Sequence, residues 1–241
     1  MGEVAGTASV RRRGGEIVSS VLVALGCVLF LGGSAWGALQ YRPYTVPTDS
    51  MAPTVAAGER VLAQRIDGDR VRRGDVVVFT DPQWGDLPMV KRVVAVGGDE
   101  VDCCDARGRL TVNGQAVEEP YLSGGGPAST GGFRAQVPDG RLFLLGDSRE
   151  VSLDSRVHLA DGTDGAVPRS GVRARVDATA WPPAGLRTVP RPEGFAQLPG
   201  GVSRPGPLVP LLWAVGTGAL LILGGAAYGP IARRVGRGPA S

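Results

Sequence analysis

The chain of 241 residues is short of the side chains from which most active sites are built. It has one histidine, three cysteines and, among 26 basic residues, a single lysine, Lys91. One histidine argues against a metal site, and we expect neither a metal nor a cofactor. Three cysteines do not supply the disulfide framework of a small secreted domain. The adjacent Cys103 and Cys104 leave open a strained vicinal disulfide.

The excess of positive charge is also small. The formal net charge is +3, and the arginines that flank two uncharged runs explain it, so we expect no nucleic-acid partner. These runs are residues 17–39 and 208–228, with 23 and 21 positions and no charged side chain. A helix needs about 20 apolar residues to cross a bilayer. Each run is therefore predicted to be a transmembrane helix of the cell membrane.

Arginines outside the two runs indicate the orientation. They are Arg11, Arg12 and Arg13 before the first run and Arg233, Arg234 and Arg237 after the second. Cytoplasmic flanks carry an excess of Lys and Arg, so both ends are predicted to be cytoplasmic. The expected order is a cytoplasmic N-terminus (1–16), a transmembrane helix (17–39), an extracytoplasmic β domain (40–181), a proline-rich tether (182–207), a transmembrane helix (208–228) and a cytoplasmic tail (229–241). A removable secretory signal is an alternative interpretation of the first run.

Between the two runs, short stretches rich in Val, Leu and Phe alternate with clusters of Gly, Pro and Asp, as is typical of strands and turns. The expected strands are 60–65, 75–79, 89–96, 109–112, 141–145 and 172–180. Asn113-Gly114 favours a type I′ hairpin turn, and the glycine-rich stretch 123–132 is predicted to be a mobile surface loop. We therefore predict a mainly β fold: an antiparallel, partly closed, β-barrel-like extracytoplasmic domain with one transmembrane helix at each end.

Ser50 is the first candidate for chemistry. It lies in Val46-Pro-Thr-Asp-Ser-Met-Ala-Pro-Thr54, where bracketing prolines disfavour a helix. A serine in such a loop needs a base before it can serve as a nucleophile. A trypsin-like order would place a histidine upstream of the serine in Gly146-Asp147-Ser148, whereas the only histidine, His158, follows it. No Gly-x-Ser-x-Gly elbow occurs either, so a Ser–His triad is disfavoured.

Lys91 is the second candidate. It lies in an otherwise apolar strand pattern, Pro88-Met-Val-Lys-Arg-Val-Val-Ala-Val96. A solvated charge is the simplest interpretation, yet every other basic residue is Arg, which cannot release its proton, whereas a buried Lys can. Lowering the pKa of Lys91 from about 10.4 to about 7 or 8 costs roughly 3–5 kcal/mol, and an apolar pocket can supply such a shift. Neutral Lys91 could then take the proton of Ser50.

The segment 144–156 follows a hydrophobic strand and is dense in polar groups. As structure, its Asp147, Arg149, Asp154 and Arg156 form a turn held by ion pairs. As chemistry, one of its hydroxyl groups could orient the amine of Lys91.

Together these segments resemble the bacterial type I signal peptidases, a Ser–Lys dyad family, and in particular its two-span actinobacterial members. The motifs that carry the resemblance are Pro47-Thr-Asp-Ser-Met-Ala-Pro-Thr54, Arg73-Gly-Asp-Val-Val-Val-Phe79, Val90-Lys-Arg-Val-Val94, Gly97-Gly-Asp99 and Gly146-Asp-Ser-Arg-Glu-Val-Ser-Leu-Asp-Ser-Arg156. They occur in this order and cover most of residues 46–176.

The resemblance implies a membrane-bound serine endopeptidase that removes signal peptides from exported preproteins after small residues, usually Ala-x-Ala. Ser50 corresponds to the nucleophile, Lys91 to the general base, Thr48 with the Ser50 backbone N–H to the oxyanion hole, and Ser152 to the serine that orients the lysine. The implied supporting residues are Arg92, Asp147, Asp154 and Arg156, and the implied substrate pocket is lined by Val46, Met51 and Val90. Expected partners are signal-peptide-bearing preproteins, the lipid bilayer and the secretion translocon.

Two positions depart from the family pattern. Asp49 replaces Gly or Ser and is expected to point to solvent, because a carboxylate facing Lys91 would raise its pKa. Ser148 replaces Asn. These departures leave open a catalytically inactive relative that serves as a membrane-tethered adaptor of the export machinery. A LexA-like self-cleaving Ser–Lys peptidase and a His158-dependent hydrolase are further alternatives; two spans and the lack of a DNA-binding module disfavour the former.

Overall fold

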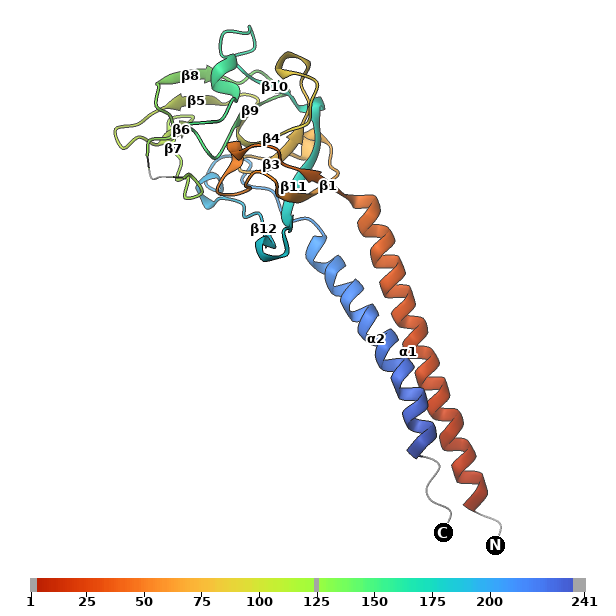
Figure 1. Cartoon of the computed structure of the whole chain (residues 1–241). Coiled ribbons are helices and arrows are strands. Elements are labelled where there is room, and N and C mark those ends of the chain that lie inside the picture. The colour runs from red at the N-terminus through yellow and green to blue at the C-terminus, as the bar shows by residue number, and fades with distance from the viewer. Residues whose placement is uncertain (1–3, 124–125, 236–241) are drawn as a thin grey trace. The chain divides into compact units, whose positions relative to one another are not determined.

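Two long helices and a β unit make up the computed structural model, which describes residues 4–123 and 126–235 (Figure 1). Its contacts divide into two units: α1 (Val4–Gln40) with α2 (Leu208–Val235), and the β unit from Tyr41 to Gly206. The segments Gly15–Gln40 and Leu208–Gly229, with 26 and 22 residues, are long and apolar enough to cross a bilayer. The outer ends of both predicted cytoplasmic segments, including Arg237, lie outside the described residues.

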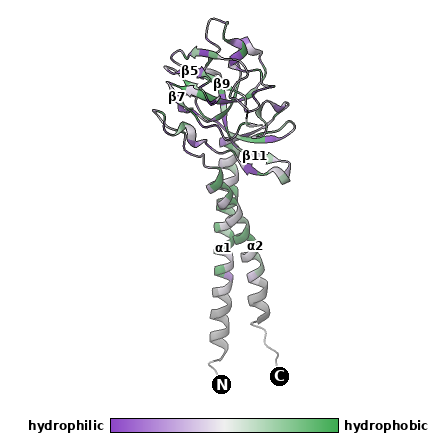
Figure 2. Cartoon of the chain, turned by 90° about the vertical axis from the view of Figure 1, so that its left-hand side faces the viewer, coloured by the Kyte–Doolittle hydropathy of each residue, from purple (hydrophilic) through white to green (hydrophobic). Residues whose placement is uncertain are grey.

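Glycines allow α1 and α2 to approach each other closely. A Cβ on Gly26 would lie 2.8 Å from the carbonyl oxygen of Gly218, and a Cβ on Gly218 would lie 2.6 Å from the amide nitrogen of Phe30. The hydroxyl of Ser19 donates a hydrogen bond to the carbonyl of Gly225 (2.6 Å). Close contact through small residues is typical of helix pairs in membranes. Figure 2 shows hydrophobic colours along both helices, whereas most hydrophilic colours lie on the β unit.

The β unit contains two antiparallel sheets, ordered β1-β2-β11-β3-β4-β9-β10, with β12 beside β11, and β7-β6-β5-β8. The first sheet consists of β1 (Tyr41–Thr45), β2 (Arg60–Gln64), β3 (Val76–Phe79), β4 (Met89–Val96), β9 (Arg141–Leu145), β10 (Val167–Pro168), β11 (Val172–Trp181) and β12 (Arg187–Thr188). The second consists of β5 (Glu100–Cys103), β6 (Leu110–Val112), β7 (Gln115–Ala116) and β8 (Phe133–Gln136). Register shifts in β11 and between β4 and β9 bend the larger sheet. The predicted antiparallel, partly closed β fold is confirmed.

All six predicted strands are present, with ends that differ by no more than one residue from the expected ranges. Asn113 and Gly114 have φ angles of 53° and 74° and connect β6 to β7, as a type I′ turn requires. The sequence pattern did not reveal β1, β5 or β8, because their polar and apolar residues give no continuous hydrophobic run. Cys103 and Cys104 are joined by a disulfide, the pairing that the sequence left open.

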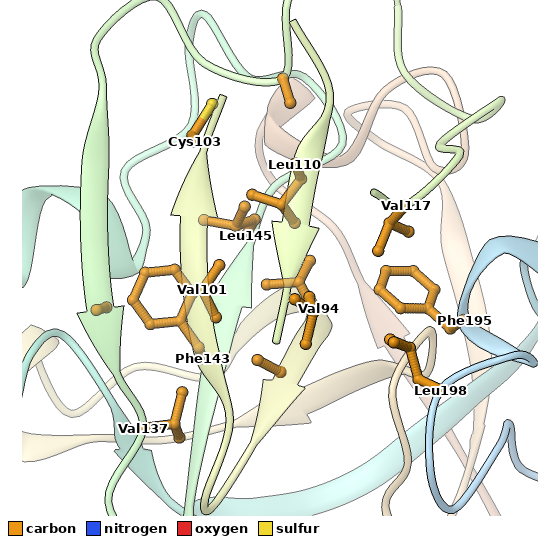
Figure 3. Close-up of a cluster of buried hydrophobic side chains, with 14 of the residues drawn as sticks. Val94, Val101, Cys103, Leu110, Val117, Val137, Phe143, Leu145, Phe195 and Leu198 are labelled. Carbon is orange, nitrogen blue, oxygen red and sulfur yellow. The ribbon is translucent and has the colours of Figure 1, made fainter. Parts of the chain in front are cut away.

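The predicted tether, 182–207, is part of the β unit for nearly all of its length, which corrects the sequence interpretation. Its strand β12 pairs with β11, and the amide of Val189 donates to the carbonyl of Asp177 (2.9 Å). Phe195 and Leu198 are buried in the core, beside Val117 (Figure 3). Seven prolines suggested an extended linker, but two apolar side chains hold this segment against the sheets.

Phe195→Ala should therefore destabilise the β unit by about 3–5 kcal/mol, the usual cost of removing a buried aromatic side chain. Guanidinium unfolding of the full chain in a mild detergent would measure the loss. Leu186→Ala is the matched control, because Leu186 belongs to the same segment but is exposed, and it should change the free energy of unfolding by less than about 0.5 kcal/mol. Equal, small effects of the two changes would mean that the segment is a detachable tether.

Candidate active site

Ser50 lies in a tight turn, Asp49–Met51, that follows β1. Met51 is fully buried and anchors the turn in the apolar core. The carbonyl of Ser50 accepts a hydrogen bond from the amide of Ser148 (3.1 Å), which joins this turn to the segment after β9. Asp49 is exposed, and its carboxylate accepts from the amide of Ala57 (2.8 Å). Asp49 thus has a partner on the solvent side of the turn, as the sequence led us to expect.

Lys91 lies in the middle of β4, opposite Val77 of β3. Its Nζ donates a hydrogen bond to the Oγ of Ser50 over 2.7 Å. The Oγ1 of Thr48 donates to the same Ser50 oxygen over 3.2 Å. Only 5% of Lys91 and 7% of Ser50 are exposed. The fold therefore brings together three of the predicted site residues, from two separate stretches of the chain.

Burial lowers the pKa of Lys91 below its ordinary value, because the ammonium form loses its hydration. The carboxylates of Asp154 and Asp147 act in the opposite direction, and the guanidinium of Arg156 adds to the lowering. The opposing effect is limited because each carboxylate already has an arginine partner. The environment thus makes the neutral amine, the form that can accept a proton, easier to reach than in an exposed lysine.

The first of these pairs, Arg92 with Asp147, is almost entirely buried. Two hydrogen bonds of 2.8 and 2.6 Å run from the guanidinium to the carboxylate, and the exposed fractions of the two side chains are 1% and 0%. The guanidinium also donates to the carbonyl of Gly74 (2.9 Å) and lies 3.9 Å from the ring centre of Tyr121. Two of the implied supporting residues are thus paired with each other, and the pair fixes β4 against the segment that carries Asp147.

The second pair, Asp154 with Arg156, supports the backbone of this segment. The Asp154 carboxylate accepts from the Arg156 guanidinium (2.8 and 2.9 Å) and from the amide of Gly146 (3.0 Å). Gly146 has no room for a side chain, because a Cβ there would lie 2.1 Å from the Oγ of Ser152 and 2.5 Å from the carbonyl oxygen of Ser50. This glycine lets the segment pack directly against the Ser50 turn.

A third pair was missed by sequence reasoning. The guanidinium of Arg149 bonds the carboxylate of Glu119, the carbonyl of Gly146 (3.0 Å) and the carbonyl of Ala128 (2.7 Å). Part of the glycine-rich stretch 123–132 is thus held in place, with Ala128 and Ser129 buried, although residues 124 and 125 lie outside the described part. A tyrosine next to paired glutamates and a proline (118–121) was the available signal for an anchored loop.

The charges around Lys91 balance without it. Three buried or largely buried arginines, Arg92, Arg149 and Arg156, each have a carboxylate partner in Asp147, Glu119 or Asp154. An ammonium on Lys91 would be a seventh charge without a carboxylate of its own. Because an unpaired buried charge is costly, this count gives a second reason for a lowered pKa of Lys91.

Other predicted residues are placed differently from the expectation. The Oγ of Ser152 is buried and has no hydrogen-bond partner among the described residues, so its predicted bond to Lys91 is not formed here. Val46, Met51 and Val90 pack together in one buried apolar cluster beside the Ser50 turn, with Val46 and Met51 in the core rather than at a surface. Both roles stay predictions.

His158 is occupied elsewhere. Its ring stacks on Trp84 with a centroid separation of 4.4 Å, and its Nδ1 contacts the carboxylate of Asp161 (2.7 Å). Among the described residues, His158 has no hydrogen bond to Ser50. A Ser–His arrangement is therefore not present in this structure.

The chain is similar to several known proteins. The family model "Signal peptidase, peptidase S26" matches residues 15–181. The chain is 32% identical to a probable signal peptidase I of Mycobacterium leprae, over 59% of this chain and 69% of that protein. It is 34% identical to signal peptidase IB of Staphylococcus aureus, over 69% and 89%. The crystal structure of a signal peptidase I from Enterococcus faecalis is 27% identical, with a TM-score of 0.36, over 43% of this chain and 94% of the other.

Asp147→Asn should cost about 3–5 kcal/mol of folding free energy, because it leaves the Arg92 guanidinium buried without its counter-charge. Denaturant unfolding of the full chain in detergent would measure this. The control is Asp102→Asn, which breaks the exposed pair with Arg134 and should have little effect. Equally small effects of both substitutions would mean that the buried charges do not depend on their pairing.

The single lysine allows a direct measurement of its pKa. In protein labelled with ¹⁵N at lysine Nζ, one signal should titrate with a midpoint below the ordinary value of 10.5, because the folded state disfavours the charged form. The control is the same protein in denaturant, where the midpoint should return to about 10.4. A folded-state midpoint at or above the denatured one would contradict the burial argument.

Proposed function

The chain belongs to the signal peptidase family, peptidase S26, and we propose that it is a membrane-anchored serine endopeptidase that removes signal peptides from exported preproteins with a Ser50–Lys91 dyad. The observation that carries the proposal is the 2.7 Å contact between Lys91 Nζ and Ser50 Oγ, formed in a buried site where a neutral amine is favoured. Homologous signal peptidases of Mycobacterium and Staphylococcus support the reaction class.

In the proposed reaction, the neutral amine of Lys91 takes the proton of the Ser50 hydroxyl while the Ser50 oxygen attacks the scissile carbonyl. The proton then passes to the leaving amine, and the acyl group stays on Ser50. Water, deprotonated by the same amine, releases the acyl group and restores the serine. Activity should increase as the pH rises through the pKa of Lys91, because only the neutral form accepts a proton.

The developing oxyanion would be bound by the Thr48 hydroxyl and the Ser50 backbone N–H. The position of Thr48 Oγ1, 3.2 Å from Ser50 Oγ, supports this role, since an oxyanion forms next to the nucleophile. Ser152 is buried beside the Ser50 carbonyl and has an unused hydroxyl. We propose that it turns toward Lys91 during the reaction and holds the amine in line with Ser50.

The proposed substrates carry small residues, as in Ala-x-Ala, before the cut. The support is the apolar cluster beside the Ser50 turn, to which Val46, Met51 and Val90 belong. Val90 is the most exposed of the three and would contact the substrate first.

The proposed location is the cell membrane, with two spans, both ends in the cytoplasm and the β unit outside. The two apolar helices support it, and so does the short connection to Ser50. Ser50 follows Gln40, the last residue of α1, by ten residues, so the two are at most about 35 Å apart along an extended chain. The cut would therefore be made near the membrane surface, where a translocon releases signal peptides.

Cleavage of a preprotein with an Ala-x-Ala site by the full chain in detergent tests the proposal. Ser50→Ala and Lys91→Ala should each lower the rate by at least about 10⁴-fold, because they remove the nucleophile or its base. His158→Ala is the control and should keep the wild-type rate, since its contacts are with Trp84 and Asp161.

Two outcomes would overturn the proposal in different ways. If His158→Ala alone abolished cleavage, the lysine mechanism would be wrong. If the wild type cut none of several preproteins yet bound them, the chain would instead be an inactive, membrane-tethered adaptor.

A further inference from the structure

Four arginines from different parts of the β unit line one open cavity of about 420 Å³. They are Arg42 of β1, Arg65 just after β2, Arg70 in the turn Gly68–Arg70, and Arg173 of β11. The volume lies within the range of about 300–1,000 Å³ typical of small-ligand sites. None of these residues belongs to the Ser50 site.

In the part of the chain that the structure describes, the four cavity arginines form no ion pair, and neither do six other arginines of the β unit that lie outside the cavity. Nine described arginines form ion pairs with carboxylates: Arg73, Arg92, Arg109, Arg134, Arg149, Arg156, Arg175, Arg187 and Arg191. Within the described ranges none of the four cavity arginines does so, and Arg173 has one hydrogen bond, to the hydroxyl of Thr80 (3.1 Å). The lining holds one carboxylate, Asp67, so three positive charges are unbalanced.

The four arginines repel one another, and the pairing of the strands keeps three of them in one place. Tyr41 of β1 and Arg175 of β11 both lie opposite Gln64, the last residue of β2. Each strand has a cavity arginine within two residues of these aligned positions: Arg42 in β1, Arg65 after β2 and Arg173 in β11. The three arginines are therefore fixed at one end of three neighbouring strands. Like charges held close together raise the free energy, and a bound anion would lower it.

One residue that lines the cavity follows α1 closely in the chain. Arg42 follows Gln40, the last residue of α1, by two residues, so the two Cα atoms are at most about 7 Å apart. If α1 spans the membrane, as proposed above, Arg42 lies at the level of the lipid headgroups. The lining also includes Tyr44 and Ile66, and tyrosine is enriched at that level because its ring is apolar and its hydroxyl polar.

We propose that this cavity binds the phosphodiester headgroup of an anionic phospholipid. Guanidinium groups bind phosphate oxygens in pairs of parallel hydrogen bonds, and several converge here without carboxylate partners. Free phosphate offers the same oxygens, but the two-residue link to the membrane helix favours a lipid as the source. The bound lipid would hold the β unit at the bilayer surface. This role is separate from the cleavage reaction at Ser50.

The test uses the full chain in a neutral detergent, titrated calorimetrically with dihexanoyl-phosphatidylglycerol, dihexanoyl-phosphatidylcholine or inorganic phosphate. The wild type should bind the phosphatidylglycerol saturably and at least tenfold more tightly than the other two. Arg65→Gln/Arg173→Gln should weaken that binding at least tenfold. The matched control is Arg60→Gln/Arg107→Gln, which removes two exposed arginines outside the cavity and should change the affinity less than twofold. Arg42→Gln/Arg70→Gln replaces the first variant if thermal unfolding shows that it does not fold.

If the cavity and control variants weakened phosphatidylglycerol binding equally, the proposed site would be wrong, because the overall positive charge of the surface would then explain binding. Phosphate binding as tight as phosphatidylglycerol binding would overturn the lipid assignment. Preprotein cleavage by the cavity variant should equal that of the wild type in detergent, so failure of this proposal is distinguishable from failure of the peptidase mechanism.

Discussion

The amine of Lys91 is buried next to Ser50, and the surrounding structure lowers its pKa. A lysine in an apolar strand would attract the nearest carboxylates, which would stabilise its ammonium form. Here the neighbouring carboxylates are already bound to arginines that cannot lose their protons. Because Asp147 and Asp154 are each paired with an arginine, desolvation is the largest effect on Lys91, and it lowers the pKa of the amine.

The same pairs also hold the two halves of the site together. Arg92 of β4 binds Asp147 in the segment 144–156. Asp154 accepts a hydrogen bond from the amide of Gly146, which has no side chain and so allows the Ser50 turn to pack against it. Arg149 adds the loop that contains Ala128. The same ion pairs therefore affect the pKa of Lys91 and the position of the Ser50 turn. A substitution that breaks one of these pairs alters both.

Two groups of arginines in the β unit differ in burial and in pairing. Those around Lys91 are buried and neutralised, and they support the fold from within. Those of the cavity beside β1 are exposed and have no carboxylate partner, on the part of the unit that the chain ties most closely to α1. This contrast underlies the proposed headgroup site, since unbalanced charge that the sheet holds in place remains available to an external anion.

The sequence by itself determined the general architecture and predicted the residues for the chemistry. Its single lysine, the Ser50 motif, two uncharged runs and six apolar stretches predicted the dyad, the long helices and the strands, because these signals are local in the chain. The tertiary structure alone decided that Lys91 reaches Ser50, that segment 182–207 belongs to the core and that Arg149 anchors the glycine-rich loop. It also placed Val46 and Met51 inside and gathered four distant arginines. Such features depend on contacts between residues far apart in sequence, which composition and spacing do not predict.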